Sequence, residues 1–162
     1  MASEPVNTDR SVTFAHAVYG AIIITAELVI EQDHADGAGE VIVVLLATGI
    51  VLLLAHSYAS ALALRSDGKP HKLGELTLVP VEEAPVLTSL IVPLAAFVLA
   101  ALDVLSLQTA FRVSIWSTVA FLFVIGLVES RRIGRSNLGS VLIGLVGAVI
   151  GVLVILLEVW IS

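Results

Sequence analysis

The chain of 162 residues contains no cysteine and few charged residues, with eight Lys and Arg against 14 Asp and Glu. The lack of cysteine excludes disulfides, thiolate-bound iron–sulfur clusters and thiol catalysis. The formal net charge is −6, whereas a nucleic-acid surface needs a dense basic face. We therefore expect neither a disulfide framework nor a nucleic-acid partner.

Long hydrophobic runs are what the sequence has in abundance. Hydrophobic residues make up 58% of the chain, above the roughly 45–50% typical of soluble domains. A helix of about 20 apolar residues crosses the roughly 30 Å hydrocarbon layer of a bilayer. Five such runs occur, at residues 12–30, 41–64, 85–102, 110–128 and 138–161. We predict an all-α, polytopic bundle of five transmembrane helices, forming a single membrane domain over residues 1–162.

The connecting segments predict the orientation, because Lys and Arg are retained in short cytoplasmic loops. Seven of the eight basic residues fall on alternate sides of the spans, and Arg112 alone falls on the other side. This segregation predicts a cytoplasmic N-terminus, an outer C-terminus and a cytoplasmic loop at residues 65–84. The seven residues are Arg10, Arg65, Lys69, Lys72, Arg131, Arg132 and Arg135.

Polar side chains within the spans are the first functional candidates, since burying them in lipid is costly. They recur at helical steps on the first two spans. Because these spans run antiparallel, His16 and His56 are expected at the same depth, in the cytoplasmic third of the bilayer, where they can meet. We use the name polar seam for His16, Tyr19, Ile22, Ile23, Glu27, Thr48, Leu52, His56 and Ser60.

Each polar residue of the seam also has a plain structural interpretation. A histidine in a span can simply hydrogen-bond a backbone carbonyl, and Glu27 can extend to water near the outer surface. His16 and His56 are also candidate metal ligands, although no His-x-x-x-His or Glu-x-x-His spacing supports this. Phosphate loops, dinucleotide fingerprints and haem-attachment motifs are absent from the sequence. We therefore expect no cofactor, and an enzyme is the least supported class.

Two further sets of residues predict structural contacts. Small residues at three- and four-residue steps on the last span let two backbones approach closely, either within the chain or between subunits. That helix-packing or oligomer face contains Ser140, Gly144, Gly147 and Gly151. Asp103 and Arg112 flank the turn between the third and fourth runs, and we expect them to form a structural ion pair.

Ion or proton passage is the function that the polar seam favours. Histidine titrates near neutral pH, Glu27 attracts cations at the outer mouth, and Ile22, Ile23 or Leu52 can form a hydrophobic constriction. Five spans are too few to enclose a wide pore, so this hypothesis requires a homo-oligomer in the lipid bilayer. The alternatives are a structural or accessory subunit that packs through the last span against a larger membrane complex, and a metal-binding membrane protein.

The stretch RSVTFAHAVYGAIIIT, from Arg10 to Thr25, resembles the first helix of prokaryotic relatives of the lysosomal potassium channel. That family also has a histidine near the inner end of its second helix, where this chain has Leu54-Ala55-His56-Ser57-Tyr58. The resemblance implies an oligomeric cation pore, lined by the first span with isoleucine constrictions. We expect a multi-pass protein of the cell membrane, in the inner membrane of a bacterium. Ala15 and His16 stand where the family has Ser-Asp. The His56 segment is also similar to small actinobacterial integral membrane proteins.

Overall fold

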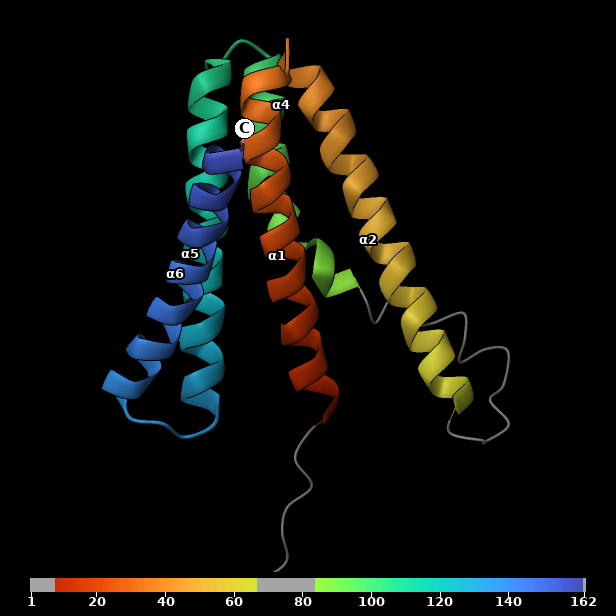
Figure 1. Cartoon of the computed structure of the whole chain (residues 1–162), viewed down its shortest axis with the longest axis vertical. Helices are drawn as coiled ribbons and strands as arrows, with labels where there is room; N and C mark the ends of the chain where they lie inside the picture. The colour runs from red at the N-terminus through yellow and green to blue at the C-terminus, as the bar shows by residue number, and fades with distance from the viewer. Residues whose placement is uncertain (1–7, 67–83, 162) are drawn as a thin grey trace, which may run out of the picture.

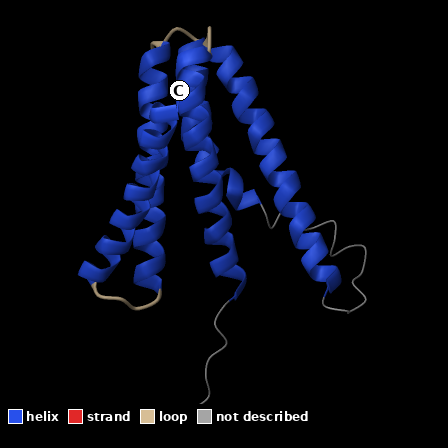
Figure 2. Cartoon of the chain, viewed as in Figure 1, coloured by secondary structure: helices blue, strands red, loops and turns tan. Residues whose placement is uncertain are grey.

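The computed structural model describes residues 8–66 and 84–161. Within these residues the structure consists of helices joined by turns, with no strand, as Figure 2 shows. The described residues form five α-helices and one 3₁₀ helix. They are α1 (Thr8–His34), α2 (Ala38–Ser66), the 3₁₀ helix η1 (Ala84–Leu90), α4 (Ile91–Ala101), α5 (Leu107–Arg132) and α6 (Asn137–Ile161).

The helices run up and down along one long axis (Figure 1). The α1–α2 and α4–α5 turns and the C-terminal end of α6 lie at one end of the bundle, and the α5–α6 turn lies at the other. The helices α5 and α6 lie side by side, whereas α2 diverges from α1 toward its own C-terminal end. The segment from η1 to α4 occupies only the upper part of the bundle in this view.

Three of the helices are long and apolar enough to cross a membrane, namely Ala38–Ser60 of α2, Leu107–Arg132 and Asn137–Trp160. A shorter apolar helical stretch runs over Leu87–Ala101. The predicted all-helical class is therefore confirmed over the described residues, and each of the five apolar runs coincides with helix. The number of spans and their orientation stay predictions. Most of the predicted cytoplasmic loop, residues 67–83, lies outside the described residues.

The third apolar run forms two kinds of helix because of its prolines. Proline lacks a backbone N–H, and its ring clashes with the carbonyl four residues earlier in a continuous α-helix. The chain is 3₁₀ up to Leu90 and α-helical from Ile91, so that Pro93 falls in the first turn of α4. Proline is tolerated in that turn, because the N–H groups there have no intrahelical partner.

One hydrophobic cluster joins five of the elements. Phe97 of α4 is fully buried, and its ring meets that of Phe111 edge-on with the centroids 4.9 Å apart. Around this pair lie side chains from α1, α2, η1 and α5, so the short η1–α4 segment is held on several sides. The cluster comprises Ile24, Leu28, Val29, Val41, Leu45, Leu52, Leu90, Ala96, Phe97, Ala110, Phe111 and Ile115.

The small-residue face of α6 packs against α5 of the same chain. A Cβ atom at Gly144 would lie 2.8 Å from the carbonyl oxygen of Phe123, and one at Gly147 would lie 2.7 Å from that of Leu122. Both distances are to backbone, so the two helices touch through their main chains. Ser140 and Gly151 of the same face are also buried. Of the two roles that the sequence left open, the structure assigns this face to packing within the chain.

The turn between α4 and α5 is stabilised by an N-cap hydrogen bond and not by the predicted ion pair. Ser106 is the N-cap of α5, and its Oγ accepts a hydrogen bond from the Thr109 amide at 3.2 Å. Asp103 has a φ of 58°, a left-handed conformation in which Asp is enriched. Asp103 and Arg112 are both exposed, and the described part of the chain contains no ion pair between them. The structure thus lacks the predicted pair, which is consistent with the small net gain of exposed ion pairs.

Candidate functional site

Three aromatic side chains of the polar seam come together between α1 and α2. The ring of His16 meets that of His56 edge-on, with the centroids 4.6 Å apart. The ring of Tyr19, one turn further along α1, lies 5.3 Å from that of His56. His16 and His56 are half-buried, and Tyr19 is 50% exposed. Two antiparallel helices therefore present a cluster of polar rings at one level of the bundle, on a face that is partly open.

The backbone of α2 orients the imidazole of His56. Its Nδ1 lies 2.9 Å from the carbonyl oxygen of Leu52, one turn earlier. A carbonyl oxygen only accepts, so Nδ1 donates the hydrogen in this bond. In the neutral ring, Nε2 is then the nitrogen with the lone pair, which is available to a proton or another ligand. This bond is the structural interaction expected for a histidine in a membrane span. It leaves the second ring nitrogen, Nε2, for another interaction.

The two isoleucines and the leucine of the seam adjoin the hydrophobic cluster. Leu52 is buried within that cluster, and Ile23 packs against it. Ile22 is half-buried. Within one chain, Leu52 and Ile23 therefore fill space in the bundle, and their role as a constriction stays a prediction.

The remaining seam residues are not gathered into the ring cluster. Glu27 is eleven residues beyond His16 on α1, which corresponds to about 16 Å along the helix. Glu27, Thr48 and Ser60 are each half-buried. The polar seam thus consists of the ring cluster, toward the N-terminal end of α1 and the C-terminal end of α2, and of separate polar positions on either side of it.

Sequence reasoning missed a polar contact on the other side of α1. The Oγ1 of Thr25 lies 2.8 Å from that of Thr118 on α5, and 2.7 Å from the carbonyl oxygen of Ala21. Thr118 in turn donates to the carbonyl oxygen of Ile115 at 2.8 Å. Both threonines are essentially fully buried. The spacing of Ser114 and Thr118, one helical turn apart, was the signal in the sequence for a polar face on α5.

The metal-binding hypothesis is supported only in part. The structure brings two imidazoles together, but no group of three His, Cys, Asp or Glu side chains that could hold a metal ion occurs among residues 8–66 and 84–161. A zinc or iron site built from protein ligands takes at least three such donors. The ring of Tyr19 also contacts that of His56.

Comparison of the chain with protein-family models finds no match, and comparisons with curated proteins and with solved structures find none either.

Proposed function

We propose that the protein is a homo-oligomeric integral membrane protein that conducts cations or protons past the cluster of His16, Tyr19 and His56. The observation that carries this proposal is the contact between the two imidazoles, 4.6 Å apart and contributed by different helices. Two polar rings at one depth are costly to place in lipid, and polar residues within spans commonly mark ion or proton pathways.

Membrane insertion with several spans is supported by the helix lengths, and the number of five is part of the proposal. The helices α1, α2, α5 and α6 contain 27, 29, 26 and 25 residues. At 1.5 Å per residue each is about 38–44 Å long, close to the roughly 40–45 Å of a bilayer with its interfaces. The η1–α4 segment is the fifth and shortest element. These lengths support a multi-pass protein in the cell membrane.

Charge supports the orientation with the N-terminus inside. Arg131, Arg132 and Arg135 lie at the α5–α6 turn, at one end of the bundle. The acidic residues around the α1–α2 turn, Asp33 and Asp36, lie at the opposite end. Under the positive-inside rule the arginine end faces the cytoplasm. The ring cluster then lies nearer to the cytoplasmic side, because His16 is eight residues from the start of α1.

An oligomer is part of the proposal because one chain does not surround a path. Tyr19 is 50% exposed on the outer surface of the bundle, so a water-filled path along α1 and α2 would need walls from other copies. The glycine face of α6 is covered by α5. We therefore place the subunit contact on the α1–α2 side, where it would enclose the ring cluster.

The alternative, an accessory subunit of a larger complex, stays a prediction. The surface that it offered for contact with a partner is covered by α5. This alternative relied on the small-residue face of α6 being available to a partner, and that face packs inside the chain. Replacement of Gly147 and Gly151 by leucine would consequently disrupt the α5–α6 pair in either case, and loss of expression would not identify a partner.

The test is ion flux in liposomes that contain the purified protein. We expect His16→Ala combined with His56→Ala to lower proton or potassium flux about tenfold or more, because the polar path is removed. His34→Ala is the matched control: His34 makes the same bond to the carbonyl four residues earlier, at 2.8 Å, but on an exposed position near the end of α1. Flux that is unchanged in the double variant at every pH tested would refute the proposal.

A further inference from the structure

The turn between α5 and α6 has a positively charged surface. Arg131, Arg132 and Arg135 lie within five residues of one another, and the side chains of all three are exposed. The nearest acidic residue in the sequence is Glu129, and its Oε2 atom is buried. No acidic residue occurs over 130–138. The arginines of this turn are therefore presented at the end of the bundle without an acidic residue between them.

Hydrogen bonds at both ends fix the backbone of this turn. The amide of Arg135 donates to the carbonyl oxygen of Ser130 at 3.3 Å. The amide of Gly134 donates to that of Arg131 at 3.0 Å, and Gly134 has the left-handed φ of 76° that this helix-ending motif needs. At the start of α6, the Oγ of Ser136 accepts a hydrogen bond from an amide of the first turn at 3.3 Å. A ligand would consequently order only the arginine side chains, because the backbone is already held.

Two large apolar side chains are exposed at the same turn. Ile133 is 69% exposed and Leu138 is 73% exposed. Apolar side chains beside basic ones are typical of segments that lie at the boundary between headgroups and acyl chains. An arginine there keeps its aliphatic stem against apolar groups and its guanidinium in the polar layer. The turn thus combines the two kinds of contact that a phospholipid makes, one with the phosphate and one with the acyl chains.

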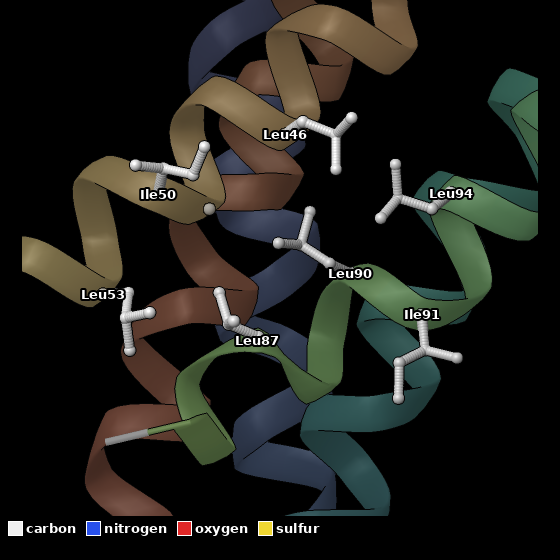
Figure 3. A pocket seen from close by; sticks show the side chains of 8 residues that line it. Leu46, Ile50, Leu53, Leu87, Leu90, Ile91 and Leu94 are labelled. Carbon is white, nitrogen blue, oxygen red and sulfur yellow. The ribbon is translucent and has the colours of Figure 1, made fainter. Parts of the chain in front are cut away.

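The apolar groove between α2 and the η1–α4 segment differs from this turn. Every residue that lines it is Leu, Ile or Gly, and Figure 3 shows Leu46 and Leu94 facing each other across the space. A ligand is selected by a small number of placed polar groups, and this groove has none. Recognition of one lipid class over another is therefore expected at the α5–α6 turn.

We propose that the α5–α6 turn binds an anionic phospholipid of the cytoplasmic leaflet, with Arg131 and Arg135 on the phosphate. Ile133 and Leu138 would lie beside the upper part of the acyl chains. A guanidinium presents several N–H donors in one plane and pairs with two phosphate oxygens at once. Basic residues at the cytoplasmic end of a span also attract anionic headgroups. A soluble phosphate would use the charge alone and would leave the two apolar side chains in water.

This proposal rests on the membrane insertion and the orientation given under the proposed function, but not on ion permeation. The site is on the exposed turn, beyond the close backbone contact of α5 and α6. A lipid at this site would therefore not have to separate the two helices.

The test is native mass spectrometry of the full chain, released from a neutral detergent after equilibration with equal amounts of phosphatidylglycerol and phosphatidylcholine of the same acyl chains. We expect the unmodified protein to retain mainly phosphatidylglycerol. Arg135→Gln should lower the ratio of phosphatidylglycerol-bound to phosphatidylcholine-bound protein about fivefold, the effect of one arginine near an anionic surface. Arg131→Gln combined with Arg135→Gln should lower it about twentyfold.

Arg112→Gln is the matched control, because it removes the same charge from an exposed arginine near the opposite end of α5. We expect it to change the ratio by less than about twofold. An equal loss in Arg112→Gln and Arg135→Gln would mean that net charge alone attracts the lipid, and it would overturn the site. Equal retention of the two lipids by the unmodified protein would overturn it as well.

Two further measurements separate a lipid from a soluble phosphate. We expect Ile133→Ser to lower the retention of both lipids and to leave their ratio unchanged, because the apolar contact does not depend on the headgroup. Unchanged retention would refute the apolar contact. Displacement of phosphatidylglycerol by an equal concentration of glycerol 3-phosphate would assign the turn to a soluble phosphate instead. None of these readouts includes flux, so a failure here is distinct from a failure of the permeation proposal.

Discussion

The α5–α6 pair and the α1–α2 pair are both antiparallel helix pairs joined by short turns, yet they are held together differently. In the first pair, glycines on α6 bring the main chains into contact, with Cβ positions at Gly144 and Gly147 less than 3 Å from carbonyl oxygens of α5. In the second, the helices diverge (Figure 1), and rings of His16, Tyr19 and His56 bridge them.

The difference separates the scaffold from the site. Close backbone contact leaves no room for ligands, solvent or movement, so α5 and α6 are suited to holding the bundle in the membrane. The wider spacing of α1 and α2 leaves room for the polar rings between them. The loosely packed pair is consequently where the proposed function is located.

The largest expected effect comes from adding one methyl group to the tight pair. Gly147→Ala would place a Cβ atom 2.7 Å from the carbonyl oxygen of Leu122, and backbone cannot move aside as a side chain does. We expect the free energy of unfolding to fall by about 1–3 kcal/mol, the usual cost of overpacking. Unfolding in increasing SDS, followed by far-UV circular dichroism, measures this.

The control for that variant is Gly39→Ala on α2. A Cβ atom at Gly39 would have nothing within 4 Å, so we expect no loss of stability. Equal destabilisation by the two changes would mean that the contrast between the two helix pairs does not exist in the membrane protein.

A smaller effect is expected one turn further along α6. At Gly151 the nearest atoms to an added Cβ are Cδ1 of Leu122, at 3.1 Å, and Cγ2 of Val119, at 3.2 Å. Both belong to side chains that can shift by a few tenths of an ångström. We expect Gly151→Ala to cost about 1 kcal/mol or less, measured in the same SDS titration. A loss larger than that of Gly147→Ala would contradict the role given to the backbone contact.

Much of the fold could be predicted from the sequence, because apolar length and charge are read directly along the chain. All five hydrophobic runs coincide with helix, and the small residues of α6 marked a packing face. The partner of that face could not be predicted, since glycine spacing is the same for contacts within and between chains. The 3₁₀ helix before Pro93 was not predicted, although the proline itself marks where a continuous α-helix is unfavourable.

The site could be predicted only where helix periodicity fixes it. The antiparallel spans and helical steps were enough to bring His16 and His56 to one level. Exposed charge was a poorer guide, because the predicted pair of Asp103 and Arg112 does not form in the described chain.

The smallest expected effect on stability concerns the hydrogen bond between α1 and α5. Thr25 ties α1 to α5 through its hydroxyl, 2.8 Å from that of Thr118, so α1 is expected to stay with the tight part of the bundle while α2 is the loose helix. Thr25→Val and Thr118→Val, alone and together, form a double-mutant cycle. We expect a coupling energy of about 0.6 kcal/mol, the average for hydrogen bonds between membrane helices, in the same SDS titration. A coupling near zero would show that each threonine is satisfied by its own helix, by the carbonyls of Ala21 and Ile115. In that case apolar packing alone would hold α1 to α5. The tightly and loosely packed parts of the bundle would then differ in side-chain packing only.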